Sequence, residues 1–137
     1  MTQPHLPLAG DRLPPSEIHI TQALIDTYAQ LSGDFNPIHV SAPAGEEAGF
    51  GGTIAHGCLP LEPVLQSLQR WSGRHSLPQG TRIQLRYRAP SRPGDTISSS
   101  ISIRDVQASG VTLIFTCNNQ HGQPVLDGEC IWPGEAL

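Results

Sequence analysis

The sequence comprises 137 residues, of which 37% are hydrophobic, and this length matches the roughly 100–200 residues of one domain. Eight basic and twelve acidic residues give a net charge of −4, which excludes a whole-chain basic footprint for nucleic acid. No apolar stretch approaches the roughly 20 residues of a membrane span, and residues 1–4 show no secretory signal. The three cysteines, which are widely spaced, argue against a disulfide framework. We therefore expect a soluble, cytoplasmic protein with one domain.

Regular secondary structure is expected to begin only after residue 16, because residues 1–16 form a Pro-rich segment. Residues 17–20 alternate and predict a short strand. Thr21 is a suitable N-cap for a helix over residues 22–32, whose apolar stripe would be Leu24, Tyr28 and Leu31. Gly33 would end this helix. Residues 33–53 are expected to be mostly loop, with one helical turn near 44–48.

The second half predicts one apolar helix followed only by strands. Apolar positions over residues 59–71 trace a wide helical face, which indicates a largely buried helix. Alternation then predicts strands over residues 81–89, 96–106, 111–118 and 123–132, separated by short turns. Hairpin spacing favours an antiparallel meander wrapped around the helix, an α+β fold.

Residues 32–39, Ser-Gly-Asp-Phe-Asn-Pro-Ile-His, are the most informative run. A helix end at Gly33 and a turn at Pro37 can aim Asp34 and His39 into one cavity. A carboxylate and an imidazole so placed can polarise one water near neutral pH. The alternative is that Asp34 caps a turn and His39 is an ordinary surface or core histidine.

A second motif, residues 53–58 (Thr-Ile-Ala-His-Gly-Cys), directly precedes the apolar helix. Glycine at a helix start lets the backbone N–H of Gly57 face a ligand oxygen, and the helix dipole favours negative charge there. These are the components of an oxyanion hole. Ordinary use of glycine at a helix entry is the alternative.

Together, residues 28–39 and the downstream Ile-Ala-His-Gly at 54–57 resemble the signatures of MaoC-like dehydratases and (R)-specific enoyl-CoA hydratases. The resemblance implies one hot-dog domain over residues 1–137, with a curved antiparallel sheet around a central helix. It implies reversible hydration of trans-2-enoyl thioesters to (3R)-3-hydroxyacyl thioesters. Asp34 and His39 would activate the water and Gly57 N–H would bind the thioester carbonyl, while Asn36 would hold the loop.

The resemblance also implies that neither a metal nor a redox cofactor is needed, since the thioester itself acidifies Cα. It implies a homodimer acting on acyl-CoA or acyl-carrier-protein thioesters. Some family members carry a serine in the central helix, whereas residues 62–65 here have no hydroxyl. Half of the arginines gather in a short span, where they could seat coenzyme A phosphates or simply form a solvated strand face: Arg82, Arg86, Arg88 and Arg92.

Other functions remain open from the residues alone. The glycines of residues 49–52 follow no strand of a βαβ unit, so they do not indicate a dinucleotide site. Cys58 could act as a nucleophile with His56, and His39 with His56 could bind metal, but the two histidines match no zinc spacing. A hot-dog thioesterase and a non-catalytic acyl-thioester-binding subunit of a heteromeric dehydratase are the remaining alternatives.

Overall fold

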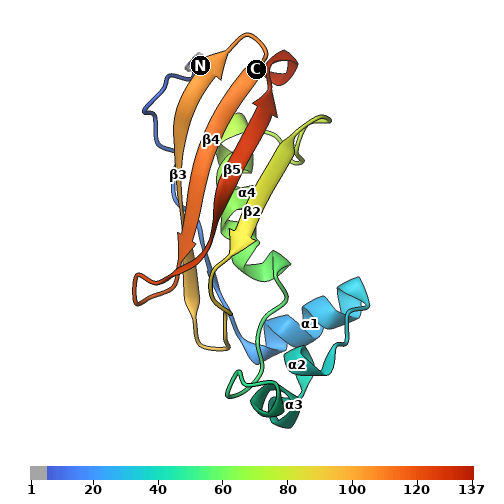
Figure 1. Cartoon of the computed structure of the whole chain (residues 1–137). Helices are drawn as coiled ribbons and strands as arrows, with labels where there is room; N and C mark the ends of the chain where they lie inside the picture. The colour runs from blue at the N-terminus through green and yellow to red at the C-terminus, as the bar shows by residue number, and fades with distance from the viewer. Residues whose placement is uncertain (1–5) are drawn as a thin grey trace.

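The structure, a computed structural model, describes residues 6–137; residues 1–5 of the predicted Pro-rich segment lie outside that range. Figure 1 shows a sheet with the C-terminus near one end, while the helices of residues 22–47 gather at the other end. The elements in chain order are β1 (Glu17–His19), α1 (Gln22–Ser32), α2 (Pro37–Val40), α3 (Ala42–Glu47), α4 (Cys58–Ser72), β2 (Arg82–Tyr87), β3 (Thr96–Gln107), β4 (Gly110–Asn118), β5 (Pro124–Pro133) and a final 3₁₀ turn (Gly134–Ala136).

The five strands form one antiparallel sheet in the order β1-β3-β4-β5-β2. The predicted meander is correct for β3, β4 and β5, but it is wrong for β2. This strand pairs with β5, with Ile83 opposite Cys130, and not with its neighbour in sequence. Both edges of β3 are already occupied by β1 and β4. Residues 88–95 therefore run from the edge strand β2 to β3, next to the opposite edge strand β1, instead of closing a hairpin.

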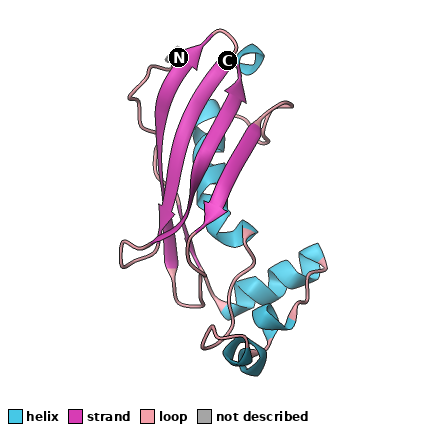
Figure 2. Ribbon diagram, in the orientation of Figure 1, coloured by secondary structure: helices cyan, strands magenta, loops and turns pink. Residues whose placement is uncertain are grey.

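The central helix α4 covers one face of the sheet, as Figure 2 shows, and supplies much of the core. Val64 and Leu68 are fully buried against inward-facing strand residues such as Ile97 and Leu113. Trp132 lies edge-on to Trp71, with ring centroids 5.2 Å apart. The expected α+β arrangement of a sheet packed on one apolar helix is confirmed. Among residues 6–137, no helix has the length and apolar character needed to cross a membrane.

Helix α1 has the expected bounds and caps, and the predicted apolar stripe is correct for Leu24 and Tyr28, which pack partly buried against the core. Thr21 accepts a hydrogen bond from Leu24 N at 3.0 Å, and Gly33 ends the helix with φ of 77°. The buried residues are Ile25 and Ala29, whereas Leu31 is 82% exposed. The prediction was wrong for Leu31 alone, because the last turn of α1 extends past the core.

The segment predicted as loop contains two short helices, α2 and α3. Asn36 caps α2 by accepting from Ile38 N at 3.2 Å, and Ser41 caps α3 by accepting from Ala44 N. Each helix has a proline in its first turn, where no backbone donor is required. The glycine and proline content hid these helices, although both caps are the residue types that start a helix. The helical turn expected near 44–48 corresponds to α3.

Truncation of Ile25 and Leu31 tests which face of α1 is buried. Ile25→Ala is expected to lower the free energy of unfolding by about 2–5 kcal/mol, because it leaves a cavity in the core. Leu31→Ala on the same helix should change it by no more than about 0.5 kcal/mol. Urea denaturation of both variants measures the difference. Equal losses would contradict the assigned face.

Candidate active site

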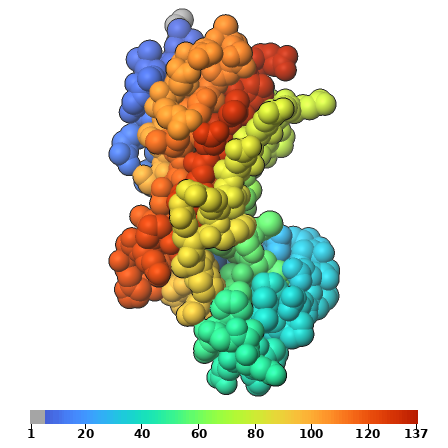
Figure 3. All heavy atoms as spheres, in the orientation of Figure 1, coloured from blue at the N-terminus to red at the C-terminus, as the bar shows by residue number. Residues whose placement is uncertain are grey.

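Asp34 and His39 approach each other at the end of the molecule formed by α1, α2 and α3, which Figure 3 shows below the sheet. The left-handed conformation of Gly33 turns the chain out of α1, so Asp34 starts the following loop. Asp34 Oδ1 accepts from the backbone N–H of Asn36 at 3.1 Å. The other oxygen, Oδ2, lies 3.8 Å from His39 Nε2. The sequence prediction that this spacing brings the two side chains together is supported by the geometry.

The backbone determines how His39 presents its ring. His39 Nδ1 lies 2.8 Å from the carbonyl oxygen of Ile54. A carbonyl oxygen can only accept, so Nδ1 carries the hydrogen and the neutral imidazole has its lone pair on Nε2. Nε2 is the nitrogen that faces the Asp34 carboxylate. Two acceptors 3.8 Å apart can hold one water that donates a hydrogen to each.

His56 contacts both Asp34 and His39. Its ring stacks on His39 with centroids 3.9 Å apart, and Tyr28 meets its edge at 4.8 Å. His56 Nε2 donates to the backbone oxygen of Asp34 at 2.9 Å. This residue is 3% exposed, and within residues 6–137 its Nδ1 has no hydrogen-bond partner. His56 thus holds both the loop of Asp34 and the plane of His39.

A second set of hydrogen bonds fixes the backbone around His39. Gln22 Nε2 donates to the His39 carbonyl at 2.9 Å, and Thr53 Oγ1 donates to Gln22 Oε1 at 2.6 Å. The backbone N–H of Ile54 donates to the carbonyl of Ile38 at 3.0 Å. Helices α1 and α2 and the segment before α4 are therefore joined by polar contacts at one place.

Gly57 and His39 line the same cleft, which has a volume of about 460 Å³. Its walls are mainly apolar, and Arg88 stands among them. Gly57 immediately precedes α4, and among residues 6–137 no protein group accepts from its N–H. A free backbone donor at a helix start is suited to an oxygen that gains negative charge. The full lining is His39, Phe50, Ile54, Ala55, Gly57, Pro60, Tyr87, Arg88, Ala89, Pro90 and Ser91.

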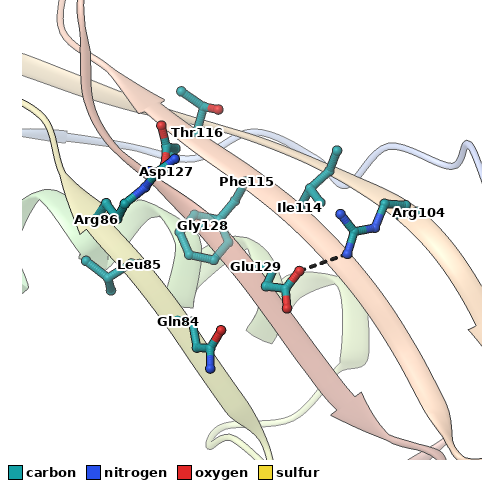
Figure 4. A pocket seen from close by; sticks show the side chains of 10 residues that line it. All are labelled: Gln84, Leu85, Arg86, Arg104, Ile114, Phe115, Thr116, Asp127, Gly128 and Glu129. Atoms are coloured by element: carbon teal, nitrogen blue, oxygen red, sulfur yellow. Dashed lines mark hydrogen bonds and ion pairs between the residues drawn. The ribbon is translucent and has the colours of Figure 1, made fainter.

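The four arginines of the sequence cluster do not all reach the cleft. Arg88 lines it, whereas Arg86 lines a separate hollow of about 520 Å³ on the face of the sheet away from α4 (Figure 4). Asp127 pairs with both, through Arg88 Nε at 2.8 Å and Arg86 Nε at 3.7 Å. Arg82 and Arg92 line neither hollow.

Within residues 6–137, one group of side chains has donor atoms that could surround a metal ion: Asp34, His39 and His56. Donor atoms of Asp34, His39 and His56 all lie within 4.8 Å of one another. His39 Nδ1 and His56 Nε2 donate to backbone carbonyls, so the lone pairs lie on His39 Nε2 and His56 Nδ1. The expected absence of a metal stays a prediction.

Sequence reasoning did not assign roles to His56 and Tyr87. The position of His56 beside Gly57 was noted, but its stacking on His39 depends on how α2 packs against residues 53–57. Tyr87, within the strand predicted over residues 81–89, is 54% exposed and lines the cleft. The position of Tyr87 at the end of a strand, where the chain leaves the sheet, was the one sequence feature that could have indicated a place in the cleft.

Comparison with known proteins shows what this chain is similar to. The family described as MaoC like domain matches residues 7–121. The chain is 30% identical over 115 residues to an (R)-specific enoyl-CoA hydratase of Rhodospirillum rubrum, covering 80% of this chain and 76% of that protein. It is 31% identical over 115 residues to Nodulation protein N of Rhizobium leguminosarum bv. viciae, covering 78% and 70% respectively.

Solved structures are similar over nearly the whole chain. An R-hydratase of Pseudomonas aeruginosa in the unliganded form superposes with a TM-score of 0.74 at 26% identity, covering 92% of this chain and 81% of that one. The prediction of a hot-dog fold is thereby confirmed. The family resemblance stated from residues 28–39 and 54–57 is confirmed as well.

The tautomer of His39 can be measured directly. In its neutral form, His39 is expected to carry its hydrogen on Nδ1, because the Ile54 carbonyl accepts from that atom. Nitrogen chemical shifts in ¹⁵N-labelled protein distinguish the two ring nitrogens, and the exposed His121 serves as an internal comparison. A hydrogen on Nε2 would show that the ring cannot accept from a water shared with Asp34.

Proposed function

The chain belongs to the MaoC-like family, and on this premise we propose that it catalyses reversible hydration of trans-2-enoyl thioesters to (3R)-3-hydroxyacyl thioesters. The observation that carries the proposal is the approach of Asp34 Oδ2 to His39 Nε2, at 3.8 Å, beside the cleft that holds Gly57. Similarity to an (R)-specific enoyl-CoA hydratase supports the same reaction class.

Hydration begins with one water held between Asp34 and His39. The water donates one hydrogen to the carboxylate and one to Nε2, so an oxygen lone pair can point at C3 of the substrate. As the oxygen–C3 bond forms, the electron pair of the double bond moves toward the thioester carbonyl. One proton of the water passes to the acceptor pair, which supplies a general base near neutral pH.

The backbone N–H of Gly57 stabilises the negative charge that develops on the thioester oxygen. Its N–H has no protein acceptor within residues 6–137 and lies at the positive end of α4. The enolate then collapses as the pair returns the proton to Cα, so one water is added and the site is regenerated. The thioester itself acidifies Cα, and the scheme uses no metal or redox cofactor. Dehydration is the same path reversed.

Removal of either polar group tests this scheme. Asp34→Asn and His39→Gln are each expected to lower kcat for crotonyl-CoA hydration by about 10²–10⁴-fold, because a general base is lost. The loss of enoyl-thioester absorbance measures the rate. The control Glu47→Gln, an exposed site with the same charge change, should match the wild type.

Three outcomes would overturn the assignment. Near-wild-type turnover by both Asp34→Asn and His39→Gln, with unchanged thermal unfolding, would remove the pair from the mechanism. Release of free coenzyme A with the double bond intact would instead identify a thioesterase. Binding of acyl-CoA without either reaction would favour the non-catalytic subunit.

We further propose that the arginines near the cleft contact the phosphates of coenzyme A or of an acyl carrier protein. Arg88 is the better placed, since it lines the cleft, whereas Arg86 lines the neighbouring hollow. Their shared partner Asp127 offsets only one of the two charges. A guanidinium group suits phosphate because it can donate two parallel hydrogen bonds.

Substitution of the arginines should act on binding more than on chemistry. Arg88→Ser is expected to raise KM for crotonyl-CoA roughly 3- to 10-fold, which corresponds to about 1 kcal/mol, and to flatten its dependence on salt. Arg86→Ser should have a smaller effect in the same direction. Arg74→Ser, an exposed arginine after α4, is the control. An unchanged KM in both the Arg88 and the Arg86 variant would indicate that these arginines form only a solvated strand face.

We also propose a cytoplasmic homodimer. Strand β2 is at one edge of the sheet, and its outer side has no strand partner within residues 6–137. An edge strand with free N–H and C=O groups is a ready site for pairing with a second chain. The end of this strand carries Tyr87 and leads to Arg88, so pairing there would place a second subunit close to the cleft.

A further inference from the structure

The hydroxyl of Tyr87 lies directly over Gly57. A Cβ placed on Gly57 would lie 2.5 Å from the Tyr87 hydroxyl oxygen and 2.7 Å from Cζ. Such distances are far inside van der Waals contact, so the side chain of Tyr87 occupies the space that any other residue at 57 would need. The φ of Gly57 is −58°, an ordinary helical value. A larger residue at 57 would therefore have to displace the Tyr87 ring, while the backbone conformation itself places no demand for glycine.

This hydroxyl is free to bind a ligand. Among residues 6–137 it has no protein hydrogen-bond partner, and Tyr87 lines the cleft together with His39 and Gly57. Burial and, to a lesser degree, the nearby Cys58 raise the pKa of Tyr87 above its usual value. The phenol consequently keeps its hydrogen throughout the neutral range and remains a donor.

We propose that Tyr87 is a second oxyanion donor, whose O–H binds the thioester carbonyl oxygen beside the N–H of Gly57. This inference rests on the proposed function and deepens it. Gly57 N–H is one donor at the start of α4, while an enolate oxygen has lone pairs for two. The phenol hydroxyl lies against the Cα of Gly57, and both residues line the same cleft. Each such donor stabilises the charge that develops in the transition state.

Tyr28 provides a matched comparison. It also lies near the site, with its ring against His56 at 4.8 Å. Cys58 and burial raise the pKa of Tyr28 above its usual value, and Tyr28 does not line the cleft. Removal of this hydroxyl deletes the same atom as Tyr87→Phe, but from a side chain outside the cleft lining.

The test compares Tyr87→Phe with Tyr28→Phe in crotonyl-CoA hydration. Tyr87→Phe is expected to lower kcat about 10- to 100-fold, at the low end for one oxyanion donor because the cleft is open. KM should change little, since the hydrogen bond strengthens only as charge develops. Tyr28→Phe should stay within about twofold of wild type. A Tyr87→Phe variant as active as the wild type, in an active enzyme, would overturn the inference and leave the proposed function intact.

A binding measurement further separates the inference about Tyr87 from the proposed function. Acetoacetyl-CoA forms an enolate with its own ultraviolet absorbance, and an oxyanion hole favours that form on the protein. The Asp34→Asn variant should still stabilise the bound enolate, whereas adding Tyr87→Phe should weaken enolate binding about tenfold. Equal enolate binding with and without the phenol hydroxyl would overturn the inference. A wild-type protein that neither turns over crotonyl-CoA nor binds this ligand would overturn the proposed function, and the inference with it.

Discussion

The site depends on one hydrogen bond, from His39 Nδ1 to the backbone carbonyl of Ile54, at 2.8 Å. This contact determines which ring nitrogen is basic, and it joins α2 to the segment that enters α4. A second hydrogen bond, from Ile54 N to Ile38 O at 3.0 Å, joins the backbones of the same two segments. Together with the stacking of His56 on His39 and the bond from Thr53 to Gln22, it holds His39 and Gly57 in one assembly. A mechanism that needs a base and an oxyanion donor at fixed separation requires this junction.

The crossover between β2 and β3 explains why the cleft opens at this place. Because β2 pairs with β5 at the far edge of the sheet, the chain after Tyr87 must return past the start of α4 to begin β3. On the way, the carbonyl of Ser91 accepts from Ala55 N at 2.8 Å. The crossover thereby forms one wall of the cleft and carries Arg88 and Tyr87 to it. The strand order is thus a requirement of the site as well as of the core.

Local signals were sufficient for much of the fold and for the candidate pair. Thr21 and Gly33 define α1 through capping chemistry that acts within a few residues, and both were predicted correctly. Asp34 and His39 were found because their separation depends on a short turn. Strand order and the buried face of α1 depend on tertiary packing, so the expected β2 hairpin and the exposed Leu31 were misassigned. The positions of His56 and Tyr87 likewise follow only once residues 53–57 and 87–91 are packed together.

The central claim is that the carboxylate and the imidazole share one water. A high-resolution crystal structure of the unliganded protein tests this most directly. The account predicts a single ordered water about 2.7–3.2 Å from both Asp34 Oδ2 and His39 Nε2, with Nδ1 still donating to Ile54. A structure in which the carboxylate turns to bind Nε2 directly, or in which His39 rotates away from Ile54, would contradict it.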